Sequence, residues 1–354
     1  MLVRVRRLEK GIDGTPSRKA DHIRINLEQD VRAKGVTSGF EAFRFMHCAL
    51  PEIDLKDVSM HCALLGRALN APLLISSMTG GTAQAQAINR RLAAVAQEHR
   101  IAMGLGSGRA LLEHPEVLAT FDVRANAPDA LLFANLGAVQ LNRGYGAAEC
   151  KKIVDLLQAD ALILHLNPLQ EALQAEGDTA FHGLLAKIES LCEAIDFPVV
   201  VKEVGWGLSG TVVTALFEAG VSAVDVAGAG GTSWSEVERY RLSEPWRARV
   251  AATFATWGIP TAECLMSARA AAPSKTIIAS GGIRDGLDVA KAIALGADLA
   301  GIAAPFLHAA ADGHEAADNC AREIIETLRI VMFSVGAQTL RELRSGNHMQ
   351  RVDA

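Results

Sequence analysis

Short apolar runs alternate with longer segments of helical periodicity along most of this chain. Eight such runs stand out, and each is almost continuously apolar, which is typical of parallel strands covered on both faces. The runs are APLLISSM from Ala71, IAMGLG from Ile101, LLFANLG from Leu131, ALILHLN from Ala161, PVVVKEV from Pro198, SAVDVAG from Ser222, TIIASGG from Thr276 and LAGIAA from Leu299. The stretches between them, such as residues 82–100, show the apolar spacing of amphipathic helices.

This alternation predicts an α/β protein, a (β/α)8 TIM barrel with an N-terminal extension, because eight units of similar length over roughly 250 residues match that fold. A doubly wound open sheet is the alternative architecture. We expect an N-terminal arm at residues 1–70, the barrel at residues 71–340 and a C-terminal tail at residues 341–354. The long polar segment after the sixth run, residues 232–258, is expected to supply a mobile loop over the barrel mouth.

The composition narrows the class of protein further. The chain has 354 residues, is 50% hydrophobic and carries a formal net charge of −5, which argues against nucleic acid as a partner. No apolar run approaches the roughly 20 residues that a membrane helix needs. The basic N-terminus lacks the apolar core of a secretion signal, so we expect a cytoplasmic protein. The six cysteines form no C-x-x-C pair, which predicts reduced thiols rather than a zinc site.

Polar side chains follow most of the predicted strands. In a barrel of this kind, the active site lies at the carboxyl ends of the strands, where these side chains meet. They are Ser77, Thr79, Ser107, Arg109, Asn135, His165, Asn167, Gln170, Glu171, Lys202 and Thr232. Taken singly, the neutral ones are ordinary turn or cap residues. Together, the hydroxyls and amides match the edge of a flat ring that is rich in heteroatoms.

Two glycine-rich segments follow consecutive strands near the end of the barrel, GAGGTS after the sixth run and SGGIR after the seventh. Glycines allow backbone N–H groups to approach an anion closely, and barrels often bind a phosphate on these loops. The alternative is turn chemistry without a ligand. FMN fits both halves of this pattern, with its phosphate on the glycine loops and its ring beside the amides and hydroxyls.

Lys202 stands inside the apolar strand PVVVKEV and needs a partner or an anion there. It is suited to forming a Schiff base, or to lying beside an electron-rich cofactor ring whose negative charge it stabilises. The third possibility is a lysine that extends to the barrel rim.

Seven motifs together carry a resemblance to a known family. They are SRKADHIRI, SSMTGGT, GLGSGRA, HLNPLQEALQAEGD, VVVKEVGWG, AGAGGTSW and ASGGIRDG, in this order from about residue 17 to about residue 340. The chain resembles the type 2, flavin-dependent isopentenyl diphosphate isomerases. Members of that family interconvert isopentenyl and dimethylallyl diphosphate without net oxidation, using reduced FMN, Mg²⁺ and NADPH as the reductant of the flavin. The family also implies a homo-oligomer, a tetramer or an octamer.

The resemblance implies a role for each matching residue. Substrate binding would fall to Arg18, Lys19, His22, Arg109, Asn167 and Gln170, catalysis to His165 and Gln170, and Mg²⁺ binding to Glu171. FMN would contact Ser77, Met78, Thr79, Ser107, Asn135, Lys202, Thr232, Gly281, Gly282, Arg284, Ala303 and Ala304. One departure is Gly108, where the family often has a larger residue such as glutamine, and it affects the contacts expected of its two neighbours.

The expected reaction moves a double bond by adding a proton at one carbon and removing another two bonds away. Our hypothesis is that reduced FMN stabilises the cation-like species, that Lys202 tunes the flavin, and that Gln170 positions or assists the proton transfer. Asn167 and Pro168 also look like a helix start, which would aim the helix dipole at an anion.

Two other functions fit parts of the sequence. A flavin-dependent hydroxy-acid oxidase would need a late histidine base, for which His308 and His314 are the candidates. A barrel that only binds a phosphorylated ligand would show neither flavin colour nor a need for Mg²⁺.

Overall fold

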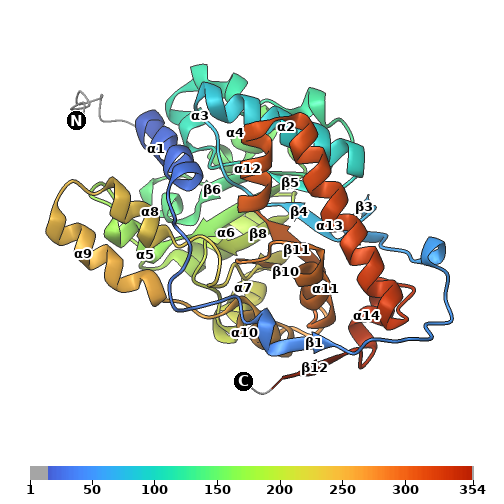
Figure 1. The fold of residues 1–354 in the computed structure, drawn as a ribbon. Coiled ribbons are helices and arrows are strands. Elements are labelled where there is room, and N and C mark those ends of the chain that lie inside the picture. Colours follow the sequence, from blue (N-terminus) through green and yellow to red (C-terminus); the bar gives the residue numbers. More distant parts are fainter. Residues whose placement is uncertain (1–14, 353–354) are drawn as a thin grey trace, which may run out of the picture.

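The barrel is the core of the computed structural model, which describes residues 15–352 (Figure 1). Its strands are β4 (Leu73–Ile75), β5 (Ala102–Gly104), β6 (Leu132–Gly137), β7 (Ala161–Leu166), β8 (Val199–Glu203), β9 (Ala223–Asp225), β10 (Thr276–Ser280) and β11 (Leu299–Ile302). All pairings between them are parallel, and β11 pairs with β4 to close the barrel. The eight predicted strands are therefore confirmed, and closure rules out the open sheet.

Helices follow the strands and cover the barrel. They are α2 (Ala83–His99), α3 (Arg109–Glu113), α4 (Ala147–Leu157), α5 (Pro168–Leu173), α6 (Leu184–Ala194), α7 (Gly210–Glu218), α10 (Thr261–Ala271), α11 (Gly286–Ala294), α12 (Ala304–Asp312), α13 (His314–Val335) and α14 (Leu340–Ser345). The segment that predicts an amphipathic helix, residues 82–100, forms α2, with the Thr82 side chain capping its first turn. None of the described helices is long and apolar enough to cross a membrane.

One end of the barrel is closed by a hairpin. Strands β2 (Cys62–Leu64) and β3 (Arg67–Leu69) pair antiparallel. Leu64 and Leu69 pack against residues of the barrel interior such as Phe133. The hairpin thus covers the amino ends of the strands, opposite the end at which the site is expected.

The chain before the barrel wraps from one side of it to the other. Helix α1 (Thr15–Glu28) contacts α8 and α12, beside the barrel mouth (Figure 1). Further along, η1 (Phe40–Ala42) leads into β1 (Phe43–Phe45), which pairs antiparallel with β12 (Met349–Arg351). The expected arm and tail are thus joined by a two-stranded sheet. Residues 1–14 of the arm and 353–354 of the tail lie outside the described residues.

The segment 232–258 is helical, so the expectation of a long loop there was wrong. It forms α8 (Trp234–Arg241), α9 (Pro245–Thr253) and η6 (Phe254–Thr256). Proline occupies the first turn of α9, where its missing N–H costs nothing. Helix α8 is rich in polar residues, so its sequence does not predict a helix with one apolar face. One of these polar residues, Glu238, is buried against α5 rather than exposed to solvent.

Candidate active site

A cavity of about 770 Å³ opens at the carboxyl ends of the barrel strands, beneath α1 and α8. Every site residue predicted from the sequence lines it. From the strands, and from the loops and helix starts that follow them, come Ser77, Met78, Thr79, Ser107, Arg109, Asn135, His165, Asn167, Gln170, Glu171, Lys202, Thr232, Gly281, Gly282, Arg284, Ala303 and Ala304, and from α1 come Arg18, Lys19 and His22. The structure thus brings the predicted residues together, while the roles given to them stay predictions.

Strand register explains why the charged groups inside the barrel meet. His165, Lys202 and Asp225 occupy the same level on β7, β8 and β9. Because level neighbours in a parallel sheet point to the same face, all three project into the barrel. Lys202 Nζ forms an ion pair with Asp225 Oδ2 at 3.0 Å. The ammonium is therefore satisfied inside the barrel and does not reach the rim.

His165 is a neutral imidazole in this setting. Burial, helped by the positive charge of Lys202 and Lys19, lowers the pKa of His165 to about 4. Its Nδ1 lies 2.8 Å from Asn135 Oδ1, an atom that only accepts, so Nδ1 carries the proton. The other ring nitrogen, Nε2, is consequently an acceptor. His165 can take up a proton or accept a hydrogen bond, but it is not a cationic acid at neutral pH.

The two glycine-rich loops pack backbone against backbone. A Cβ atom on Gly281, whose φ is +100°, would lie 2.0 Å from the carbonyl oxygen of Gly228. A Cβ on Gly230, whose φ is +117°, would lie 2.0 Å from the amide nitrogen of Ser38 in the arm. Arg284 donates to the carbonyl of Gly230 across the loops. Side chains are excluded from this corner, which leaves the backbone and Arg284 to receive an anion such as a phosphate.

Several hydroxyl groups directly after β4, on one side of the cavity, lack a protein partner. The oxygens Ser76 Oγ, Ser77 Oγ and Thr79 Oγ1 are buried and form no hydrogen bond. Buried polar groups are normally satisfied, so unpaired ones point to a polar ligand. Together with the glycine loops, they fit FMN, whose ring has nitrogen and oxygen atoms at its edge and whose chain ends in a phosphate.

Positive charge gathers under α1. Lys19 donates to the carbonyl of Ser107 at 2.8 Å and lies 4.8 Å from the ring centroid of Phe121. Burial first, and then the charges of Arg18 and Arg109, lower the pKa of Lys19 to about 7. The pKa of Arg18 is lowered by the same two kinds of cause, burial and the charge of Arg109. Such mutual repulsion is relieved by an anion, so this part of the cavity suits a diphosphate.

Helix α5 begins at the mouth with Pro168 in its first turn, as predicted, but Asn167 does not cap it. Instead, Asn167 Nδ2 donates to Glu171 Oε1 at 2.8 Å and to Gln170 Oε1 at 3.1 Å. The carbonyl oxygen Asn167 Oδ1 is buried without a partner. A carboxylate beside an unpaired amide oxygen is a donor set that suits Mg²⁺, which takes oxygen ligands and keeps several waters.

Glu238 of α8 holds this side of the cavity together. Its Oε1 accepts from His22 at 3.1 Å, Gln170 at 3.0 Å and Gln174 at 2.9 Å, and its Oε2 accepts from Arg241 at 2.6 Å. Burial disfavours its charge, but the hydrogen bond from His22 and the charge of Arg241 outweigh burial and lower the pKa of Glu238 to about 2. Glu238 is thus a carboxylate that fixes the orientation of Gln170.

Sequence reasoning missed five residues of this site: Asp225, Ser280, Ser76, Glu238 and Gln174. Asp225 interrupts the apolar run SAVDVAG in the same way as Lys202 interrupts its own strand, so the same argument could have found it. Glu238 gave no such signal, because the segment was interpreted as a loop.

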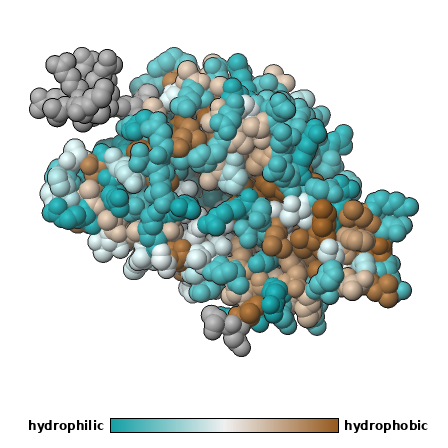
Figure 2. Space-filling view, in the orientation of Figure 1, coloured by the Kyte–Doolittle hydropathy of each residue, from teal (hydrophilic) through white to brown (hydrophobic). Residues whose placement is uncertain are grey.

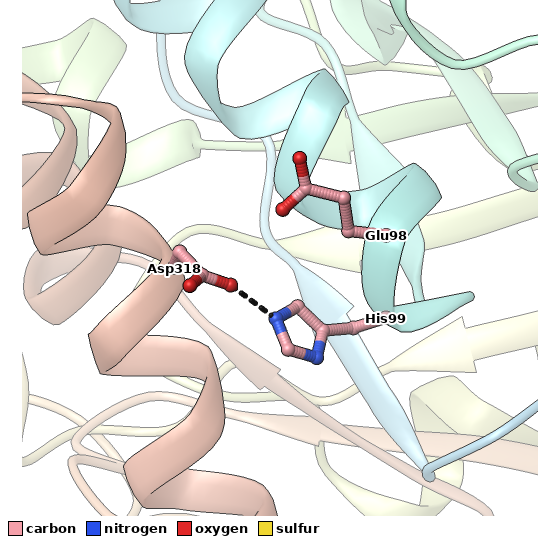
Figure 3. Close-up of side chains that lie close together, drawn as sticks. All are labelled: Glu98, His99 and Asp318. Carbon is pink, nitrogen blue, oxygen red and sulfur yellow. Dashed lines mark hydrogen bonds and ion pairs between the residues drawn. The ribbon is translucent and has the colours of Figure 1, made fainter.

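A second cluster of titratable groups lies outside the cavity. His99 at the end of α2 faces Asp318 of α13 at 2.7 Å, with Glu98 beside it (Figure 3). Asp318 also pairs with Arg322, and Glu98 with His314. These groups satisfy one another between two outer helices. His314 does not line the cavity, where an oxidase base would have to lie, and His308, which does line it, is exposed.

Comparisons with known proteins agree with this geometry. The sequence model of the family described as FMN-dependent dehydrogenase matches residues 150–350. Among solved structures, a substituted flavocytochrome b2 with sulfite bound has a TM-score of 0.68 at 17% identity, covering 93% of this chain and 82% of that one. The monotopic membrane protein (S)-mandelate dehydrogenase has a TM-score of 0.64 at 16% identity, covering 95% and 98%. The fold and site thus define an FMN-binding TIM barrel.

Relatives with much higher sequence identity than these solved structures define the family more closely. A protein of a Nostoc species named isopentenyl-diphosphate delta-isomerase is 55% identical over 338 residues, 96% of this chain and 97% of that one. Proteins of the same name from a Synechococcus and a Synechocystis species are 56% and 53% identical, over 93% and 94% of this chain and 94% and 95% of theirs. The chain belongs to the type 2, FMN-dependent family of isopentenyl-diphosphate delta-isomerases.

Proposed function

We propose that this enzyme interconverts isopentenyl and dimethylallyl diphosphate by a 1,3-allylic proton shift, with reduced FMN and Mg²⁺ bound in the barrel mouth. The observation that carries the proposal is one cavity in which unpaired hydroxyls and glycine loops adjoin a cluster of half-buried cations and a carboxylate. One region suits a flavin phosphate and ring, and the other suits a diphosphate with its metal.

FMN would be held by residues in or directly after five strands, β4, β6, β8, β9 and β10. Its phosphate would lie against the glycine loops and Arg284, and its ring against Ser77, Thr79, Asn135 and Lys202. When bound and reduced, the flavin supplies negative charge and a proton-exchanging ring next to the substrate. Lys202 is paired with a carboxylate at 3.0 Å, so it acts as a fixed cation rather than as an amine that attacks carbon.

The diphosphate would be held by Arg18, Lys19 and Arg109, with His22 and Asn167 nearby. Glu171 and the unpaired carbonyl oxygen of Asn167 would hold Mg²⁺, which in turn binds substrate phosphate oxygens. Arg18 and Lys19 lie on α1, so a bound diphosphate would contact both this helix and the barrel.

Proton handling by the protein falls to neutral groups. Gln170 uses both ends of its amide, donating to Glu238 and accepting from Asn167, and so presents a fixed surface to the substrate. An amide is a poor acid, so Gln170 orients the reacting carbons or a water rather than giving up its own proton. His165 can accept a proton at Nε2, which makes it the titratable protein group best placed to remove one.

We further propose NADPH as the reductant of the flavin and a homo-oligomer as the assembly. Support for the assembly comes from four exposed apolar side chains, Met46, Leu50, Leu55 and Ile330, which are 46%, 75%, 36% and 47% exposed. The short helix Leu55–Asp57 contacts α13, which carries Ile330. Figure 2 shows hydrophilic residues over most of the face that includes α1, and hydrophobic ones gathered toward α13 and α14.

The test combines colour and turnover. The purified chain should show the absorption of bound FMN, and anaerobic conversion of isopentenyl diphosphate should require both Mg²⁺ and a reductant, with NADPH sufficient. Glu171→Gln should keep the flavin and lower turnover about 100-fold or more, because it removes a metal ligand. Bleaching of the flavin by lactate or glycolate, with no diphosphate conversion, would instead identify an oxidase.

A further inference from the structure

Asp225 is a fully buried carboxylate directly behind a group that lines the cavity. It is 0% exposed, whereas its partner Lys202 is 8% exposed and faces the cavity. Ser280 completes a triangle, since its Oγ accepts from Lys202 Nζ at 3.0 Å and donates to Asp225 Oδ1 at 2.7 Å. The three residues come from neighbouring strands β8, β9 and β10, so the barrel itself fixes their arrangement.

Burying these two charges costs free energy that structural stability alone does not require. Two buried charges lose their hydration, and an apolar pair of similar volume is often as stable or more stable. The ammonium has three N–H donors, of which one is donated to Ser280, and it forms an ion pair with Asp225. The positive charge of Lys202 can therefore act on a ligand in the cavity, while the carboxylate of Asp225 lies behind Lys202, away from the cavity.

We propose that Asp225 sets the reduction potential of bound FMN by offsetting the charge of Lys202. This inference rests on the proposed placement of the flavin beside Lys202, but not on the diphosphate substrate. Reduction adds negative charge to the flavin ring, which Lys202 stabilises and Asp225, farther away, opposes through a medium that screens poorly. Asp225 thereby limits how strongly the barrel prefers reduced over oxidised FMN.

The experiment is a reductive titration of the FMN-loaded protein without any diphosphate. Asp225→Asn keeps the shape of the side chain and an oxygen that accepts from Ser280, so Lys202 stays in place with its charge uncompensated. We expect a more positive midpoint potential, and reduced FMN held more tightly relative to oxidised FMN by on the order of tenfold. Ser280→Ala is the matched control, because it loses hydrogen bonds of the same triangle but keeps both charges, and its potential should stay near that of the wild type.

Either of two results would overturn the inference: an unchanged or more negative potential in Asp225→Asn, or an equal shift in Ser280→Ala. If Asp225→Asn does not fold, the double variant Lys202→Gln/Asp225→Asn is compared with Lys202→Gln. We expect the more positive potential in the double variant, and an equal or more negative one contradicts the inference. A wild-type protein that binds FMN but converts no diphosphate would refute the proposed function and leave this result standing.

Discussion

At the scale of single residues, the site is built from charges and hydrogen-bonding groups whose ordinary behaviour is altered by burial. Lys19 is pushed toward neutrality, His165 is held neutral, and Glu238 is held ionised. Burial is the main cause for Lys19 and His165, and nearby cations add to it, whereas the donors around Glu238 outweigh its burial. An anionic ligand would oppose the change at Lys19, because its negative charge would offset the charges of Arg18 and Arg109.

We therefore predict that the affinity for inorganic pyrophosphate falls as the pH rises through about 7, the value to which the pKa of Lys19 is lowered. Below that pH the ammonium is already present to meet the anion. Above it, binding must first take up a proton, which weakens affinity by up to about tenfold per pH unit. Isothermal titration calorimetry at several pH values measures this.

Lys19→Arg is the control for that experiment, because a guanidinium stays charged throughout the range. The affinity of this variant for pyrophosphate should depend less on pH than that of the wild type. Because both proteins bind the same ligand, the titration of pyrophosphate itself affects both profiles equally. Parallel profiles for the two proteins would show that Lys19 does not titrate in this range.

At the scale of elements, helix packing explains the one departure from the family pattern. Gly108 precedes α3, and a Cβ atom there would lie 2.9 Å from Ile153 Cγ2 on α4 and 3.3 Å from the carbonyl oxygen of Asn135. The glycine is therefore matched to the isoleucine of the neighbouring helix. Its φ of −78° is open to any residue, so only packing opposes a side chain.

Gly108→Gln should accordingly lower the free energy of unfolding by about 1–3 kcal/mol through overpacking. It should have little effect on FMN affinity, because the new side chain points at α4. In combination with Ile153→Ala, which opens the space, the loss should be smaller than the sum of the two single losses. Denaturant unfolding of the four proteins checks this, and strictly additive losses would mean that the two side chains do not meet.

At the scale of the whole molecule, the barrel can be predicted from the sequence, because each buried strand is a distinct apolar run. The polar residues at the strand ends then meet at one mouth of the barrel. The same logic places the predicted site residues around one cavity. This logic misses the residues whose role depends on contacts between elements. Glu238 and Gln174 depend on α8 packing on α5, and the pairing of Lys202 with Asp225 depends on strand register, neither of which local periodicity contains.

The assembly can also be tested at this scale. Leu50→Glu places a charge in the exposed apolar region around α13 and should reduce the mass of the particle measured by light scattering, because it disfavours burial between copies. Leu185 on α6 is also exposed, at 44%, and Leu185→Glu should leave the mass unchanged. A monomeric wild-type protein, or equal effects of both substitutions, would remove this region as the interface.

The most direct measurement for the whole account is turnover of isopentenyl diphosphate in deuterated buffer, with reduced FMN and Mg²⁺, followed by mass spectrometry of the dimethylallyl diphosphate formed. An allylic proton shift in a mouth that exchanges protons with solvent predicts one deuterium in the product. Conversion without deuterium, or no conversion by a protein that carries reduced FMN, would contradict it.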